Sequence, residues 1–293
     1  MSIIIFFIIL LILVLVHEFG HFGTAKKFGI RVDEFGFGFP PKLFGIKKGE
    51  TEYTFNLLPF GGFVKIFGEN PDDENTFGPD ASRSFVNKPR WQQAIVLFAG
   101  VFANFVLAWF LFSFGFMSGM PSSVGSEVKG YELKDVGTVV VSVAADSPAF
   151  LAGLKSGDKI VFLKNKDAET SFVSPDSVKS FIITGQEIEL GYTRGQDKNI
   201  NLVKIKPKSI DNEKDPKIGI SMDSIGIAKL PILLAFKEGM ILTIDVTKGT
   251  VFGLYSLARD GLKGKGDLSS ITGPVGLVGI VGDAYDFGFS YLL

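Results

Sequence analysis

Two long apolar runs constrain this chain more than any other feature of its sequence. Residues Ile3 to Val16 are apolar without interruption, and Ala94 to Met117 carry no charge. Extended through Ala25, the first run would be about 34 Å long as a helix, enough to cross a bilayer. A mean hydropathy of +0.31 and 30 phenylalanines agree with a membrane protein. We therefore expect transmembrane helices at 1–25 and at 94–117.

The first run has an alternative interpretation as a secretory signal peptide. Such a peptide has basic residues before its apolar core and a small-residue cleavage site after it. Here no basic residue precedes the run, and the polar pair His17-Glu18 follows it. These differences favour a membrane helix.

Basic residues predict the orientation of the two helices, because Lys and Arg concentrate in short cytoplasmic loops. The N-terminus carries no basic side chain, whereas six lie close to the helix ends between the two runs: Lys26, Lys27, Arg31, Arg83, Lys88 and Arg90. The sequence thus predicts a cytoplasmic segment at 26–93, with the N-terminus and the residues beyond 118 on the other side.

The other segments have patterns of their own. Residues 32–67 alternate strand-like pieces with turn residues, so 26–93 should form a β-hairpin region. The stretch 225–285 is apolar but carries Lys237, Glu238, Asp245 and Lys248, which favours an amphipathic helical region at the membrane face over a span. Residues 286–293 begin another apolar run, which we expect to be the start of a truncated third transmembrane helix.

Charge and cysteine content exclude several functions. Lys and Arg number 30 against 31 Asp and Glu, so there is no electrostatic footprint for nucleic acid. Cysteine is absent, which excludes disulfides and thiolate metal ligands. Any metal must be held by His, Asp or Glu.

The two histidines of the chain form the motif His17-Glu18-Phe19-Gly20-His21 at the end of the first run. On a helix, imidazoles four residues apart share one face and can bind a single Zn²⁺ ion. Glu18 could then take a proton from the water that zinc activates. Because ionisable residues within a membrane helix are energetically costly and usually functional, the location strengthens this hypothesis.

This motif and three segments described below resemble the site-2 protease family (peptidase M50) of intramembrane zinc metalloproteases. Within that family, they resemble the bacterial regulator-of-sigma-E proteases in particular. The resemblance runs over nearly the whole chain. It implies that His17 and His21 are zinc ligands and that Glu18 is catalytic. The implied fold is a polytopic α-helical membrane protein with a membrane-associated β-hairpin region and an inserted α+β PDZ domain.

Two of these segments carry candidate substrate-positioning residues. Pro59, Gly61 and Gly62 lie in Leu58-Pro-Phe-Gly-Gly-Phe-Val-Lys65, which is similar to a Pro-x-Gly-Gly-[Phe/Tyr]-Val-Lys segment of the family. The family implies a β element near the active site, but an ordinary surface hairpin fits equally well. Gly100 and Asn104 resemble the family's Gly-x-x-x-Asn motif, and they could equally serve only in helix packing.

The third segment lies at about 121–208, where Ser147 to Ile160 resembles the PDZ domains of bacterial proteases. In its sequence, Pro148 should begin a short helix and Gly153 should end it. Strand-like runs flank this segment at 138–143 and 188–193. A PDZ fold can bind a peptide or protein partner by strand addition. The charge pattern puts this domain on the extracytoplasmic side.

The resemblance also implies what the protein does and where. It predicts cleavage of a transmembrane segment of a single-span protein, such as an anti-sigma factor, in the bacterial inner membrane. The family's third zinc ligand is an aspartate in a Leu-Asp-Gly motif. Asp260-Gly261 lacks the apolar context of that motif, so we expect the ligand beyond Leu293.

Two other functions stay open from the sequence. A membrane-bound PDZ scaffold with an incomplete catalytic centre would explain the missing third ligand, although the intact His17, Glu18 and His21 oppose it. An anchored zinc peptidase of the soluble type would need the motif outside the bilayer, which the unbroken apolar run before His17 opposes.

Overall fold

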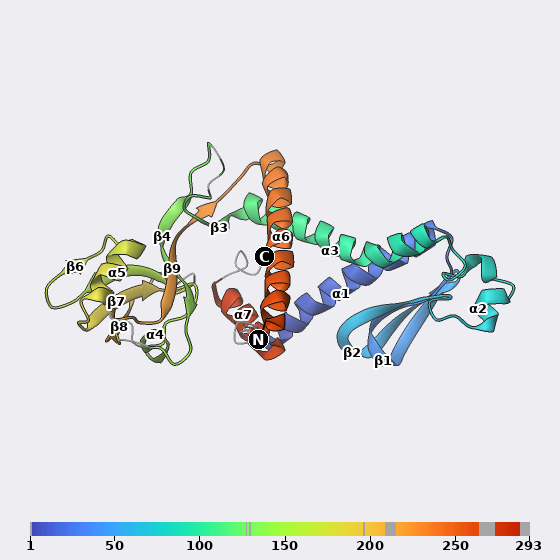
Figure 1. Ribbon diagram of the computed structural model, residues 1–293, viewed down its shortest axis with the longest axis horizontal. Coiled ribbons are helices and arrows are strands. Elements are labelled where there is room, and N and C mark those ends of the chain that lie inside the picture. The colour runs from blue at the N-terminus through green and yellow to red at the C-terminus, as the bar shows by residue number, and fades with distance from the viewer. Residues whose placement is uncertain are drawn as a thin grey trace. The chain divides into compact units, whose positions relative to one another are not determined.

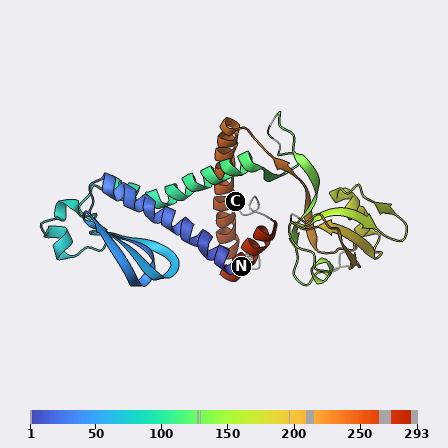
Figure 2. The ribbon, with the colours of Figure 1, turned by 180° about the vertical axis from the view of Figure 1, so that it is seen from behind.

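The computed structural model describes residues 2–126, 128, 130–195, 197–208, 215–263 and 273–287. The chain divides into two compact units, residues 1–111 and 112–293, and the long helix α3 (Arg90–Ser118) passes from one to the other. Figures 1 and 2 show the elements of both units from opposite sides.

The first unit is built on α1 (Ser2–Lys27) and the first part of α3. Among the described residues, these two helices are long and apolar enough to cross a membrane. At 26 and 29 residues they are about 39 Å and 43 Å long, more than the hydrocarbon core requires. They come together near the end of α1 that carries Lys27 (Figure 2), where Gly20 lies against Ala99. Small residues at this point let the backbones approach closely.

Strands β1 (Val32–Lys48) and β2 (Thr51–Ile66) form an antiparallel sheet beside α1 (Figure 1). Each strand pairs with the other twice, because both bend along their length. Phe35, for example, lies opposite both Tyr53 and Val64. The sheet therefore has four short segments, and the segment 58–66 forms the edge next to α1. The region expected to be hairpin-rich is thus one twice-folded hairpin.

Beyond the sheet, two short helices, α2 (Asp73–Phe77) and the 3₁₀ helix η1 (Ala81–Arg83), lead to α3. A small core closes this end of the first unit, and Ala25, Ile30 and Val32 within it are fully buried. Ile66 and Val96 belong to the same core. It therefore fixes the end of β2 and the start of α3 against the end of α1.

The second unit contains an antiparallel sheet. Its strands follow the order β3-β9-β4-β5-β7-β8, and β6 pairs with β5. Its strands are β3 (Met120–Ser123), β4 (Lys134–Val143), β5 (Lys159–Lys164), β6 (Glu169–Thr170), β7 (Ile188–Thr193), β8 (Asn201–Ile205) and β9 (Ile220–Ala228). Helices α4 (Pro148–Leu151) and α5 (Pro175–Ile183) complete this α+β domain. The Ser147 hydroxyl caps α4, and Gly153 follows it with a φ of +83°.

Two boundaries differ from the sequence expectation. The sheet does not end near residue 208, because β9 pairs with both β3 and β4. For the same reason, the segment expected to be helical from residue 225 begins as the end of a strand. Helix α6 (Ile232–Leu262) starts only after Pro231, and α7 (Pro274–Phe287) follows it. Of the expected third transmembrane helix at 286–293, residues 288–293 lie outside the described residues.

Candidate active site

The two histidines lie one turn apart on α1, and their rings face each other. The Nε2 atoms of His17 and His21 are 3.1 Å apart, and their ring centroids are 4.7 Å apart. Two imidazole nitrogens bound to one tetrahedral zinc ion would be about 3.3 Å apart. The pair is therefore held at nearly the separation that zinc requires.

Helix α3 fixes the ring of His21. Its Nδ1 atom lies 2.7 Å from the carbonyl oxygen of Val96, a residue that is 1% exposed. Because a carbonyl only accepts hydrogen bonds, this contact puts the ring proton on Nδ1 and leaves the lone pair of Nε2 for a metal. A backbone carbonyl that orients a histidine in this way is a common feature of zinc sites.

Gly100 lies one turn after Val96 on the same face of α3. A Cβ atom at Gly100 would lie 2.7 Å from His17 Nε2 and closer still to His21 Nε2. The absence of a side chain therefore keeps open the space beside both ligand atoms. This contact joins two of the four sequence motifs: the histidine motif of α1 and the Gly-x-x-x-Asn motif of α3.

Asn104 follows one further turn along α3. Its Oδ1 atom is buried and has no hydrogen-bond partner among the described residues. A buried amide oxygen left without a donor costs about 1–3 kcal/mol. A water molecule or a substrate N–H group would satisfy it.

Glu18 faces the edge of the sheet. The backbone of Val64 on β2 lies next to its carboxylate, and both residues line a cavity of about 160 Å³. The other lining residues are His21, Ile66, Glu69, Phe85, Val96 and Leu97. Glu18, the catalytic candidate, thus lines a cavity that His21 also lines.

The glycine segment of β2 lies against α1, one turn before the histidine motif. A Cβ atom at Gly62 would lie 2.9 Å from Leu15 and 2.8 Å from the backbone of Gly36. Gly61, with a φ of +95°, lies beside Val14. Pro59, three positions before Gly62, is exposed. The structure therefore brings Gly61 and Gly62 close to the helix that carries the motif.

Three residues of this site were not expected from the sequence: Val64, Val96 and Glu69. Val64 and Val96 act through their backbones, so their side chains give no sign of the role. Val96 could have been found from its position four residues before Gly100, which puts both on one helix face. For Glu69, no motif or spacing in the sequence indicates a place in this site.

Within the described residues, no group of three His, Cys, Asp or Glu side chains could hold a metal ion. His17 and His21 fit two of the three protein ligands that a catalytic zinc takes, since their nitrogens converge and one ring is oriented. The third ligand is not among these residues.

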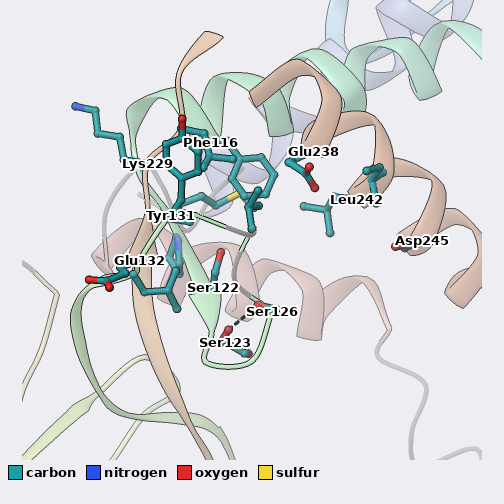
Figure 3. Close-up of a pocket in the computed structure, with 17 residues that line it drawn as sticks. Phe116, Ser122, Ser123, Ser126, Tyr131, Glu132, Lys229, Glu238, Leu242 and Asp245 are labelled. Atoms are coloured by element: carbon teal, nitrogen blue, oxygen red, sulfur yellow. Dashed lines mark hydrogen bonds between the residues drawn. The ribbon is translucent and has the colours of Figure 1, made fainter. Parts of the chain in front are cut away.

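The second unit has a separate cavity of about 350 Å³ between β3, the end of β9 and α6. Figure 3 shows Glu238, Leu242 and Asp245 of α6 on one side of it and Ser122 of β3 on the other. Its lining includes neither a histidine nor a residue of the first unit. It is therefore a different kind of site from the one at His17.

Paired imidazoles and a neighbouring carboxylate are the groups that zinc hydrolases use on peptide bonds. They define the class to which this site belongs, the zinc metalloproteases. Comparison with known proteins narrows the class. The model of peptidase family M50 matches residues 5–293, so the chain belongs to that family, the site-2 proteases.

Individual relatives agree with this family assignment. A protein of Clostridium perfringens whose name describes a zinc metalloprotease is 35% identical over 96% of this chain and 75% of its own length. A similarly named protein of Fusobacterium nucleatum is 30% identical over 99% of this chain and 78% of its own length. The regulator of sigma-W protease RasP of Bacillus subtilis is 27% identical over 94% and 78%. The chain is thus a membrane-associated zinc metalloprotease.

Among solved structures, the PDZ domain of an SdrC-like protein from Listeria monocytogenes matches 31% of this chain and 92% of that domain. The sequence identity is 26% and the TM-score is 0.26.

Proposed function

We propose that this protein cleaves transmembrane segments of single-span membrane proteins, with His17 and His21 as zinc ligands and Glu18 as the catalytic acid and base. The observation that carries the proposal is the pair of Nε2 atoms 3.1 Å apart on a helix of membrane-spanning length. A carboxylate from another part of the protein would complete the ligand set.

When bound, zinc supplies Lewis-acid activation of water and of the scissile carbonyl. Glu18 accepts a proton from the attacking water and delivers it to the leaving amine nitrogen. The backbone of Val64 lies next to this carboxylate, and both residues line the cavity. The amide oxygen of Asn104, which is buried and has no donor among the described residues, is available to a substrate N–H group.

A transmembrane helix must unwind before any of its carbonyls can be attacked, and its exposed N–H and C=O groups then need partners. The sheet edge at 58–66 lies along α1 and can supply them by strand addition. Large apolar side chains around the bends of this sheet are exposed, as expected for a membrane-associated element: Phe39, Leu43, Phe44, Ile46, Leu57, Leu58 and Phe60. Gly62 brings this edge close to α1.

The α+β domain would bind a peptide or protein partner. Among the described residues, β3 pairs with β9 at Ile225–Ala228 and the N–H of Val124 donates to the carbonyl of Ser224. Residues 220–223 of β9 therefore have one strand edge free within that part of the chain, and α5 lies next to this strand. An extended peptide could add there, between β9 and α5. Protection of the amides at 220–223 from hydrogen exchange on adding a peptide would test this, and protection elsewhere would contradict it.

The remaining parts of the proposal concern location. The distribution of basic residues supports a multi-pass protein of the bacterial inner membrane, with the α+β domain on the extracytoplasmic side. Kinship with a protein named as a regulator of sigma-W supports an anti-sigma factor as substrate.

The Glu18→Gln variant of the full-length protein tests the central proposal. Cleavage of a single-span substrate should be lost, while zinc content and expression stay at the wild-type level. Retained cleavage would remove Glu18 from the mechanism. Absence of zinc from the wild-type protein in detergent would instead favour the alternative, a catalytically incomplete PDZ scaffold.

A further inference from the structure

The cavity beside Glu18 is lined mainly by apolar residues, together with His21 and two carboxylates. Its walls come from Val64 and Ile66 of β2, from Phe85, and from Val96 and Leu97 of α3. At about 160 Å³ it has the volume of about five water molecules, which suits a single side chain. It belongs to the reaction centre because Glu18 and His21 also line it.

Glu69 is the second carboxylate of this cavity, and it is exposed, so it lies at the open end. The backbone around it is well fixed. Its N–H group donates to the carbonyl of Ile66 at 3.2 Å, and the N–H of Phe85 donates to the carbonyl of Phe67 at 2.8 Å. Gly68, with a φ of +79°, is packed against Ser84. The position of the Glu69 backbone is therefore part of the fold.

Glu69 shares this cavity with Glu18 and His21, and it has no ion-pair partner among the described residues. Within the described part of the chain, no Lys or Arg lines the cavity. Lys65 alternates with Val64 and Ile66 along the strand, so it belongs to the opposite face of the sheet. The Glu69 carboxylate is therefore available to pair with a cationic group of a bound substrate.

We propose that Glu69 is a specificity-determining residue that selects substrates with a Lys or Arg side chain next to the scissile bond. The alkyl part of such a side chain would contact Val64, Ile66 and Leu97, and its charged end would reach the Glu69 carboxylate. Long basic side chains commonly bind in this way, with the stem on apolar surface and the head at a polar rim. This inference rests on the proposed function of the same site.

The test uses full-length protein in detergent and pairs of single-span substrates that differ only by Lys or Gln. The replacement is scanned through the positions on both sides of the cut. At one position, Lys should raise kcat/KM about threefold to fivefold over Gln, as expected for a partly exposed ion pair. The gain should appear mainly in KM, since the contact is made equally in the bound substrate and in the transition state.

In Glu69→Gln the Lys-to-Gln ratio should fall to about one, and in Glu69→Lys it should fall below one. The matched control is Glu74→Gln, an exposed carboxylate of α2 that does not line the cavity, and there the ratio should keep its wild-type value. Zinc content and thermal midpoint measured on each variant separate specificity from misfolding.

A wild-type enzyme with no preference at any position, or a ratio that Glu69→Gln leaves unchanged, would overturn the inference. Binding of the same peptides, followed by fluorescence anisotropy, reports the preference without cleavage. If no substrate is cleaved but the Lys peptide still binds more tightly through Glu69, the proposed function fails while the basic-residue pocket stands.

Discussion

Gly100 of α3 lies directly against His17 of α1, so that a methyl group at Gly100 would come within 2.7 Å of the ring nitrogen Nε2. The two residues are 83 positions apart in the chain, by subtraction of their numbers. This contact makes the metal site a product of two helices, because α1 carries the ligands and α3 leaves the space beside them.

Gly100→Ala should therefore weaken zinc binding. The added Cβ atom would stand in the space next to both Nε2 atoms, and the ligands would have to move apart. We expect an affinity loss of about 10- to 100-fold, the range found when the surroundings of zinc ligands are disturbed. Metal analysis of the purified protein after dialysis against a zinc buffer measures it.

Gly23→Ala is the matched control for this change. It makes the same substitution on a helix that carries the site, but no atom of the described residues outside the glycine's own surroundings lies within 4 Å of the new Cβ atom. Its zinc content should equal that of the wild type. Equal zinc loss in both variants would show that the effect comes from the helix itself and not from the space beside His17.

Gly62→Val should reduce cleavage while zinc stays bound. A side chain at Gly62 would collide with Leu15 and with the backbone of Gly36, which would push the sheet edge away from α1. The contact between the Val64 backbone and the Glu18 carboxylate depends on that approach. We expect activity to fall by about 100-fold, because small displacements of groups at a reaction centre have effects of this size. Parallel loss of zinc would contradict this explanation.

Glu50 gives the first unit a pH dependence. Its carboxylate accepts hydrogen bonds from Lys26 and from Arg83, each at 2.5 Å. The hydrogen bond from Lys26 lowers the pKa of Glu50 most, the bond from Arg83 adds to this, and partial burial opposes it. Because the folded pKa lies below the unfolded value, the ion pairs stabilise the fold above the ordinary pKa of 4.5. That stabilisation is lost as the pH falls through the folded pKa.

Glu50→Gln should thus lower the free energy of unfolding at neutral pH by less than about 1 kcal/mol, as for other partly exposed pairs. The difference from wild type should shrink below pH 4.5. Thermal midpoints of both proteins between neutral and acidic pH measure it, with the exposed Asp73→Asn as control. A constant difference at all pH values would show that charge is not the cause.

The α+β domain contains a buried ion pair whose loss should be more damaging. Asp158 is fully buried, and Arg194 donates to both of its oxygens at 2.7 Å. Arg194→Met would leave the carboxylate buried without its cation, at a cost of about 3–5 kcal/mol. The free energy of unfolding of this domain, followed by denaturant titration of the full-length protein, checks the value.

Lys164→Met provides the comparison. Lys164 pairs with Glu169 at 2.7 Å, but about half of each side chain is exposed, so its removal should change the free energy of unfolding far less than the loss of Arg194. Similar losses in the two variants would mean that burial of Asp158 has little effect on stability.

The sequence by itself determined the chemistry of the protein and its relation to the membrane. Spacing of four residues on a helix is enough to place His17 and His21 on one face, since the helix repeat is local. Apolar length alone predicts membrane-spanning helices, because the bilayer thickness sets the length required.

Tertiary structure decided what completes and surrounds the motif. Val96 orients His21 through a carbonyl, Val64 contacts Glu18 through the backbone, and Glu69 shares its cavity. Backbone groups are the same in every residue, so their roles depend on how distant segments pack and not on residue type. Strand β9 shows the same limit: its pairing with β3 and β4 overrides the apolar pattern that had predicted a helix from residue 225.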